Sequence, residues 1–429
     1  MSGLFVGVDL GTSGVRAVAL DSQDGLVAQA RTGLPGSPQE PGKPCREPAV
    51  WWSAVQDTLA ALLVQVDPQR VRALAVDGTS GTLLVTDAQG RPLTPASLYN
   101  DRAPDRHVER VAALAPPTAA AHGAQSPAAR LMALLREVPD AVHVLHQADW
   151  IAARFSGRLG VSDDNNALKL GWDAAARLWP DWLVEAGIPA RLLPHVMQPG
   201  EPVGTVTPAL TSRLRLPQDC LVAAGSTDGV AAFLATGADR VGDAVTSLGS
   251  TLVVKLLAER PVSAPEFGLY SHRLGRHWLV GGASNSGGAA LLQHFSAERM
   301  TELTPSLRPE RPTGCRFYPL PGSGERFPIN DAALRSRVDP RPADDAVFFQ
   351  GLLEGVADIE RLAYQRIEAL GAPAPRRVLT VGGGARNPAW TQIRARVLGL
   401  PMAEPMHEEA ACGSARLAHR AWLSWQAQR

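Results

Sequence analysis

The stretch Val-Gly-Val-Asp-Leu-Gly-Thr-Ser-Gly-Val-Arg, residues 6–16, decides how the rest of the chain is interpreted. An apolar run at residues 4–8 predicts a buried strand, and another at residues 15–20 predicts a second strand. The turn between them holds two glycines and two hydroxyl residues, Gly11, Thr12, Ser13 and Gly14. Small residues let a backbone approach a phosphate closely and direct its N–H groups at it. The turn therefore predicts a phosphate site, although an ordinary hairpin would have the same pattern.

Asp9 closes the first predicted strand, directly before the turn. A carboxylate at this place can hold a hydrated divalent metal ion beside a phosphate. The lysines of the chain lie outside any Gly-Lys-Ser/Thr loop, which excludes a P-loop nucleotide site; they are Lys43, Lys169 and Lys255. If the protein binds ATP, glycine turns and a metal ion must therefore hold its phosphates.

The composition is that of a globular protein with two domains. The chain has 429 residues, 45% of them hydrophobic, which is enough for two cores. Its 42 basic and 42 acidic residues balance, so neither nucleic acid nor an anionic membrane is an expected partner. We expect no membrane-spanning segment and no leader peptide, and the isolated cysteines suit the reducing cytoplasm. A proline- and glycine-rich stretch at 194–217 predicts a domain boundary near residue 218, with domains at 1–217 and 218–429.

Further strands and a helix follow the first hairpin. Residues 26–30 predict a third strand, 48–66 a helix with an apolar face, and 71–76 a fourth strand. This order of three strands, a helix and a strand resembles the ribonuclease-H-like fold of the sugar kinase, actin and Hsp70 superfamily. The fourth strand breaks into Asp-Gly-Thr-Ser-Gly-Thr at 77–82.

A polar segment, Leu-Tyr-Asn-Asp-Arg at 98–102, comes directly after an apolar stretch. Its side chains combine hydrogen-bond donors with the carboxylate acceptor of Asp101. Such a group can hydrogen-bond several hydroxyls of a sugar, and a solvent-exposed loop is the alternative.

The second half opens with a strand, a polar turn and a helix. Residues 221–225 predict the strand, Gly-Ser-Thr-Asp-Gly at 225–229 the turn, and residues 230–234 the helix. Asp228 therefore lies at a helix N-terminus, where an acid can face a substrate lodged between the halves. A plain N-cap aspartate has the same pattern, and the two roles do not exclude each other.

The turn of the first hairpin has a counterpart in the second half. Leu-Gly-Ser-Thr at 248–251 lies between two predicted strands, as Leu-Gly-Thr-Ser does at 10–13. Two such hairpins predict a duplicated fold in which each half offers a phosphate-binding turn. The metal-facing acid is not duplicated, because Ser247 stands where the first hairpin has Asp9.

A run of three glycines, residues 382–384, ends a predicted strand and opens a helix. Without side chains, Gly383 and Gly384 allow a flat base or ribose to lie against the backbone. Asn387 can hydrogen-bond the adenosine, and Trp390 can flank it. In this order, after two phosphate turns, the triplet predicts an adenosine site.

From Leu4 to about Leu417 the sequence resembles the FGGY family of carbohydrate kinases. The matching motifs follow the chain in order: VDLGTS at 8–13, YNDR at 99–102, GSTDG at 225–229, SLGST at 247–251, GGGARNP at 382–388 and EEAACGSA at 408–415. Within the family, the short length and the turn at 77–82 are most similar to compact D-ribulose kinases, often labelled xylulose-kinase-like. Longer xylulose kinases carry Ser-Gly-Gln-Met-His-Gly there, and their Trp-Val-Glu-Gln after the first Pro-Gly is here Lys-Pro-Cys-Arg at 43–46.

The resemblance implies two ribonuclease-H-like α/β domains with a cleft between them, the first with the sugar site and the second with the ATP site. It implies transfer of the γ-phosphoryl group of ATP, with Mg²⁺, to a terminal hydroxyl of a small sugar. Asp228 would be the general base, Asp9 would orient Mg²⁺ through water, and Thr12 would cradle the phosphoryl group. The implied contacts are Asp9, Ser80, Asp101 and Asp228 for the sugar, and Gly11, Thr12, Ser13, Gly249, Ser250, Thr251, Gly383, Gly384, Asn387 and Trp390 for ATP.

D-Ribulose, converted to D-ribulose 5-phosphate, is the expected substrate, and D-xylulose or another ketopentose or polyol is the alternative. An actin- or Hsp70-like ATPase would share the two phosphate turns but would not need Asp228 or the polar segment at 98–102. A catalytically silent sugar-binding regulator should have lost one of the acids or turns, all of which this chain keeps. We expect a monomer or a homodimer.

Overall fold

The computed structural model describes residues 3–36 and 44–429, which form two compact units. Unit 1 contains the chain up to Ala235 together with His272–Gly275 and Glu409–Arg429, and unit 2 contains Thr236–Ser271 and Arg276–Glu408. Lys43 and the Pro-Gly before it lie outside the described residues. In the part of the chain that is described, we find no helix long and apolar enough to cross a membrane.

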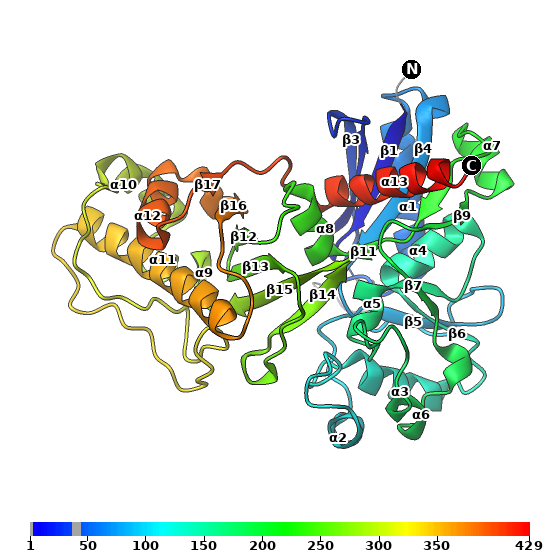
Figure 1. The fold of residues 1–429 in the computed structure, drawn as a ribbon, viewed down its shortest axis with the longest axis horizontal. Helices are drawn as coiled ribbons and strands as arrows, with labels where there is room; N and C mark the ends of the chain where they lie inside the picture. Colours follow the sequence, from blue (N-terminus) through cyan, green and yellow to red (C-terminus); the bar gives the residue numbers. More distant parts are fainter. Residues whose placement is uncertain (1–2, 37–43) are drawn as a thin grey trace. The chain divides into compact units, whose positions relative to one another are not determined.

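Unit 1 is built on a sheet with the strand order β3-β2-β1-β4-β10-β9, in which β11 also pairs with β4 (Figure 1). Its strands are β1 (Leu4–Leu10), β2 (Gly14–Leu20), β3 (Leu26–Gly33), β4 (Val71–Gly78), β9 (Pro202–Thr205), β10 (Leu221–Ala223) and β11 (Ser226–Thr227). β1, β2 and β3 form an antiparallel meander, and β4 pairs in parallel with β1. The predicted first hairpin and the order of the elements around it are confirmed.

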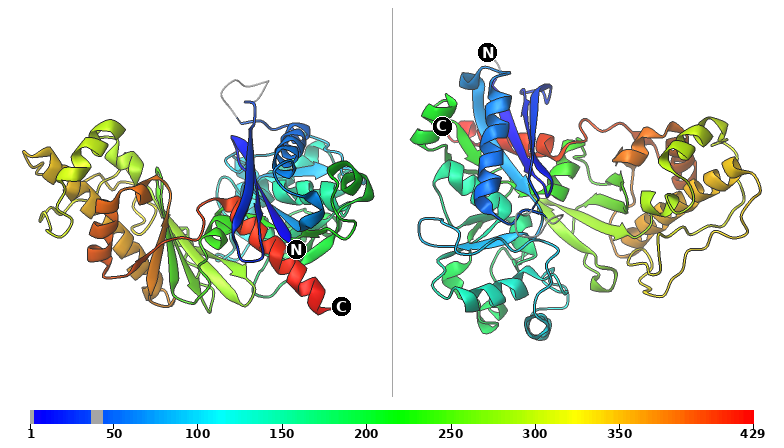
Figure 2. Two further views of the ribbon diagram at one scale, coloured as in Figure 1. Left: turned by 90° about the horizontal axis from the view of Figure 1, so that it is seen from above. Right: turned by 180° about the vertical axis from the view of Figure 1, so that it is seen from behind.

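Helices cover both faces of this sheet (Figure 2). α1 (Pro48–Leu63) shares a core with alternate residues of β1, among them Val6 and Val8. On the other face Phe5 packs with α13 (Ala410–Ala427), and α8 (Asp228–Ala235) lies beside that helix. Successive side chains of a strand point to opposite faces, which is why the continuous apolar run of β1 is buried on both sides.

The rest of unit 1 is mostly helical. Its helices are α2 (Asp105–Leu114), α3 (Pro127–Glu137), α4 (Gln147–Ser156), α5 (Asp164–Leu168), α6 (Trp182–Glu185) and α7 (Pro208–Leu214), with 3-10 turns at Pro68–Arg70 and Ala190–Leu192. Two short strand pairs join them, β5 (Leu83–Thr86) with β6 (His143–His146) and β7 (Val161–Asp163) with β8 (His195–Met197). A second core, which includes Leu131 and Leu183, joins α2, α3 and α6, whereas α4 packs into the core of the sheet.

Unit 2 repeats the topology of the first sheet. Its strand order is β15-β13-β12-β16-β17, formed by β12 (Asp243–Leu248), β13 (Leu252–Ala258), β15 (His277–Ser284), β16 (Arg377–Val381) and β17 (Met402–Ala403). A further strand, β14 (Tyr270–Leu274), begins in unit 2 and ends in unit 1. β12, β13 and β15 form an antiparallel meander, and β16 pairs in parallel with β12. The duplicated fold predicted from the two similar hairpins is therefore confirmed.

The helices of unit 2 share an apolar core, and a buried ion pair joins two of them. They are α9 (Gly288–Leu291), α10 (Ala297–Leu303), α11 (Asp345–Ala369) and α12 (Pro388–Leu398), with 3-10 turns at Pro265–Phe267, Thr304–Ser306 and Gly383–Arg386. Arg394 of α12 donates to Glu360 of α11 through Nε at 2.6 Å and Nη2 at 2.7 Å, and both side chains are fully buried. This paired charge fixes the two helices to each other.

The compact units divide the chain at other places than the expected boundary at 217/218. β10 and β11 pair with β4, so the strand expected to open the second half completes the sheet of unit 1. α13 packs on β1 and β4, so the C-terminal end of the chain also belongs to unit 1. These pairings join residues far apart in the sequence, and local composition carries no trace of them. Asp228 consequently lies in the same unit as Asp9.

Candidate active site

Three aspartates, Asp9, Asp77 and Asp228, gather at one edge of the unit 1 sheet. Asp9 and Asp77 are partners in the parallel pairing of β1 and β4. Ser226 of β11 pairs with Asp77, and Asp228 follows as the first residue of α8. The carboxyl ends of neighbouring parallel strands meet at one edge, and open α/β sheets bind their ligands there. The two predicted acids are thus brought together.

Asp77 is a member of this group that the sequence analysis did not single out. It is fully buried, and its Oδ2 accepts a hydrogen bond of 2.6 Å from the Ser414 hydroxyl of α13. Burial, followed by the charge of Asp9 and then that of Asp228, raises the pKa of Asp77 well above its usual range. The signal in the sequence was an acid at the end of a strand, the place that Asp9 has in β1.

Asp9 is buried, and burial raises its pKa, while a hydrogen bond with Asp77 and the nearby Arg16 guanidinium act in the opposite direction. Arg16 Nη1 lies 3.4 Å from Asp9 Oδ2, and Arg16 Nε lies 3.4 Å from Glu409 Oε2. Arg16 is a second residue that the sequence analysis missed. Its position beside Asp9 results from the register of the hairpin, in which Asp9 and Arg16 are direct partners.

The first glycine turn connects β1 to β2. The Gly11 N–H donates to the Gly14 carbonyl at 3.0 Å, so this amide closes the turn. It is therefore not available to a phosphate, which differs from the expected role of Gly11. Thr12 and Ser13 are exposed at the tip of the turn. The hydroxyl residues are therefore the part of the turn that a ligand can reach.

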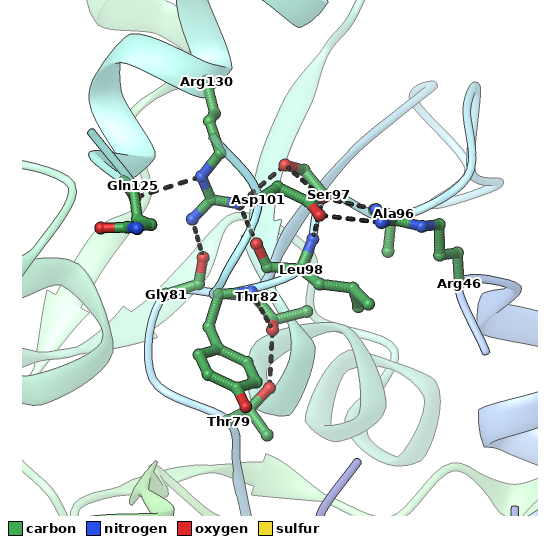
Figure 3. A network of polar contacts seen from close by, with 11 residues as sticks. Arg46, Thr79, Gly81, Thr82, Ala96, Ser97, Leu98, Asp101, Gln125 and Arg130 are labelled. Carbon is green, nitrogen blue, oxygen red and sulfur yellow. Dashed lines mark hydrogen bonds and ion pairs between the residues drawn. The ribbon is translucent and has the colours of Figure 1, made fainter. Parts of the chain in front are cut away.

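Ser80 lies in a turn that follows β4. Gln147 holds this turn through hydrogen bonds with Thr79. The Gln147 Oε1 atom accepts from the Thr79 backbone N–H at 3.0 Å and from the Thr79 hydroxyl at 2.8 Å. The Tyr99 backbone N–H donates to the Thr82 hydroxyl at 3.1 Å, which joins this turn to the polar segment at 98–102 (Figure 3). The two segments expected to contact the sugar are therefore neighbours, with Ser80 partly exposed.

Asp101 is held by protein donors. Arg46 contacts both of its carboxylate oxygens, one of them at 2.8 Å, and the Leu98 backbone N–H donates to Oδ2 at 2.8 Å. The Asp101 side chain is 23% exposed, so it remains accessible to a ligand. Hydrogen bonds from Arg46 and Leu98 outweigh partial burial and lower the pKa of Asp101, which is therefore ionised at neutral pH.

Unit 2 contains a pocket of about 580 Å³. Six residues expected to bind ATP line it: Gly249, Ser250, Gly383, Gly384, Asn387 and Trp390. Thr251 is not among the lining residues. Apolar side chains complete the wall, including Leu291, Met300 and Phe349, and nothing in the sequence distinguished these from ordinary core residues. The volume is in the range of sites for small molecules and cofactors.

The second turn packs against α9, and the helix after the glycine triplet is capped. The Gly288 and Ala289 N–H groups donate to the Gly249 and Ser250 carbonyls at 2.9 and 3.0 Å. Asn387 Oδ1 caps α12 by accepting from the Trp390 N–H at 3.1 Å. The indole of Trp390 is 4% exposed and donates to the Leu353 carbonyl at 3.2 Å, so it forms a wall of the pocket from within the core.

Two sheets of the same topology, each with a glycine–hydroxyl turn after its first strand, define the class as the sugar kinase, actin and Hsp70 superfamily. The N-terminal domain model of the FGGY carbohydrate kinases matches residues 4–235, and the C-terminal domain model matches residues 244–422. The chain belongs to the FGGY family of carbohydrate kinases. It is therefore a sugar kinase, for which the family implies ATP as the phosphoryl donor.

Similar proteins are named xylulose kinases. The chain is 28% identical over 425 residues to the xylulose kinase of Escherichia coli strain K12, covering 92% of this chain and 85% of that protein. It is 27% identical to the xylulose kinase of Klebsiella pneumoniae, covering 97% and 89%. The crystal structure of a xyloylose kinase from Brucella ovis is similar with a TM-score of 0.86 at 27% identity, covering 98% of this chain and 91% of that one.

Proposed function

We propose that this chain transfers the γ-phosphoryl group of ATP to a terminal hydroxyl of a ketopentose. The observation that supports this most is the group of Asp9, Asp77 and Asp228 at one edge of a sheet. The exposed hydroxyl residues of the first turn, Thr12 and Ser13, come three and four residues after Asp9. A carboxylate that accepts a proton and donors that hold a phosphate are the parts that this reaction requires.

Asp228 is the proposed general base. Its Oδ1 accepts from the Gly229 backbone N–H at 2.6 Å, which fixes the carboxylate at the start of α8. It accepts the proton of the sugar hydroxyl as the new oxygen–phosphorus bond forms and the bond from the γ-phosphorus to the leaving oxygen of ADP breaks.

Asp9 is the proposed partner of Mg²⁺, through water. Within residues 3–36 and 44–429, no three His, Cys, Asp or Glu side chains are placed to hold a metal ion. One carboxylate beside a phosphate site suits Mg²⁺, which keeps several of its waters and binds through few carboxylates. When bound, the ion would neutralise phosphate charge, while Asp9 itself orients the water that it contacts.

ATP is proposed to bind in the 580 Å³ pocket of unit 2. Gly249 and Ser250 lie on the wall where the phosphates would be held, and Gly383 and Gly384 offer a backbone surface to the adenosine. Asn387 and Trp390 keep this wall in place through the cap of α12 and the contact with Leu353.

Two ketopentoses are candidates for the sugar, and different observations favour them. The names of the similar proteins favour D-xylulose. The turn at 77–82 favours D-ribulose, because it has small side chains where the longer xylulose kinases carry Ser-Gly-Gln-Met-His-Gly. Gly81 has φ of 92°, a backbone conformation that a residue with a side chain rarely adopts, so this turn is built for glycine.

The test is ADP release by the purified chain with ATP and Mg²⁺ against a panel of ketopentoses, aldoses and polyols. We expect ADP release that depends on a ketopentose, with an equal amount of sugar phosphate detected by mass spectrometry. ADP release without any sugar would indicate an ATPase instead. Sugar binding without ADP release would indicate a silent regulator, and either result would overturn the proposal.

A further inference from the structure

We propose that Arg46 and Arg130 are positioning residues for the sugar, which hold the two segments that contact it in one arrangement. The first segment is residues 79–82 of the turn at 77–82. The second is residues 96–101, which overlap the polar segment at 98–102. This inference rests on the proposed function, because it assigns Ser80 and Asp101 to the sugar site. Neither arginine is proposed to touch the substrate.

Arg130 of α3 lies at the centre of a network of hydrogen bonds (Figure 3). Its guanidinium donates to the Gly81 carbonyl on one side, and to the Leu98 carbonyl at 2.8 Å and the Ser97 hydroxyl at 2.7 Å on the other. A further bond of 3.2 Å reaches the Gln125 carbonyl just before α3. Arg130 therefore links the turn that carries Ser80 to the loop that carries Asp101.

The side chain of Arg130 is only 3% exposed, and burial lowers its pKa to about 10. It still carries its charge at neutral pH, because that value is far above 7. A planar guanidinium presents several N–H groups in fixed directions, whereas a lysine offers one compact ammonium. Holding carbonyls on two separate segments requires this fork.

Arg46 extends the network to the segment before α1. It contacts both oxygens of Asp101, and the Ala96 backbone N–H donates to the Arg46 carbonyl at 2.9 Å. In the sequence, Arg46 belongs to Lys-Pro-Cys-Arg at 43–46, where this chain departs from the Trp-Val-Glu-Gln of longer xylulose kinases. The departure thus brings a cation onto a carboxylate of the proposed sugar site.

The network holds backbone and side-chain atoms next to Ser80 and Asp101, the groups proposed to contact the sugar. It does not consist of apolar core contacts. Gly81 follows Ser80 directly, and Leu98 N–H and Arg46 fix the Asp101 carboxylate from the protein side. A shift of about 1 Å in groups that position a substrate can cost as much as 10²-fold. Loss of either arginine should therefore lower the affinity for the sugar, beyond any effect that it has on the stability of the fold.

The test compares Arg46→Gln and Arg130→Lys with the unmodified chain. Arg46 is 31% exposed, so Arg46→Gln is expected to fold even where Arg130→Lys does not. Arg191→Gln is the control, because Arg191 is an exposed arginine of the same unit that donates one hydrogen bond of 2.8 Å to the Ala141 carbonyl. The measurements are kcat, the KM values for sugar and ATP, Tm, and calorimetric titration of sugar without ATP.

We expect the sugar KM and Kd of Arg46→Gln and Arg130→Lys to rise between about tenfold and 10²-fold. The ATP KM should stay close to that of the unmodified chain, and Arg191→Gln should leave both KM values unchanged. An unchanged sugar KM in folded Arg46→Gln would overturn the inference, as would parallel rises of both KM values. Absence of sugar turnover and sugar binding by the unmodified chain would overturn the proposed function itself, which is a separate outcome.

Discussion

Gly383 and Gly384 are neighbours in the chain, but a side chain added to each would meet different surroundings. A Cβ at Gly383 would have no atom within 4 Å, whereas a Cβ at Gly384 would lie 2.6 Å from the Trp390 ring and 2.7 Å from Leu248 Cβ. Both residues line the pocket of unit 2. Gly383 is therefore the position at which a side chain enters the pocket without disturbing its wall.

We predict that Gly383→Val weakens ATP binding by about tenfold or more, because the new side chain occupies space proposed for the adenosine. A misfit of one methylene group in an apolar pocket changes the free energy of binding by about 1–3 kcal/mol. Sugar affinity and Tm should stay near those of the unmodified chain, as titration calorimetry and thermal unfolding can show. Gly384→Val is the contrasting variant and should lower Tm, since it must displace Trp390. Unchanged ATP affinity in Gly383→Val would place the nucleotide elsewhere.

Asp228→Asn tests the proposed base. Asparagine has nearly the same size and can also accept at a helix N-terminus, so α8 should remain intact. It cannot take a proton from a hydroxyl, and loss of a general base typically costs on the order of 10²–10⁴ in rate. We expect that loss in kcat at saturating substrates, with Tm and ATP affinity close to the parent values. Turnover within a few-fold of the parent would leave Asp228 as a helix cap only.

At the same scale, the sequence indicated some residues of the candidate site but not those that long-range contacts bring to it. Asp9 and Asp228 were predictable, because each stands at a strand end in a turn with glycine. The role of Asp77 depends on Ser414, which approaches it from the other end of the chain. Arg130 likewise carries no signal in the sequence, because its partners Gly81 and Leu98 are brought to it only by the fold.

Among the elements, α13 shows how a helix from the end of the chain supports the first strand. A Cβ added to Gly7 of β1 would lie 1.8 Å from the Ala411 carbonyl oxygen and 2.4 Å from the Ala415 nitrogen. The backbone of α13 thus touches the backbone of β1, beside the strand end that carries Asp9. This close approach was absent from the local pattern, which predicted the strands and α1 correctly from apolar periodicity.

We predict that Gly7→Ala destabilises unit 1 by about 1–3 kcal/mol or more, because the methyl group forces β1 and α13 apart. Gly33→Ala, at the end of β3, is the control, because a Cβ there has no atom within 4 Å. Thermal unfolding should show a lower Tm for Gly7→Ala and no decrease for Gly33→Ala. Equal Tm values for the two variants would contradict the tight contact between β1 and α13.

For the whole molecule, the choice between two sugars is the sharpest consequence of the proposed function. D-Ribulose and D-xylulose differ only in the direction of the hydroxyl at C3. A site that hydrogen-bonds one epimer leaves buried polar groups unpaired with the other, and such mismatches discriminate strongly. The proposed sugar site combines Ser80, at the tip of a turn that requires glycine at position 81, with Asp101 fixed by Arg46.

Because the turn at 77–82 resembles that of the compact D-ribulose kinases, we predict that kcat/KM for D-ribulose exceeds that for D-xylulose by about tenfold or more. Both sugars should be measured at the same saturating ATP concentration, with each sugar phosphate separated and quantified so that an impurity of one epimer in the other is detected. L-Ribulose, glycerol and gluconate complete the panel and should be poorer still. Equal or better turnover of D-xylulose would contradict this preference and favour the specificity named for the similar proteins, while the assignment as a ketopentose kinase would stand.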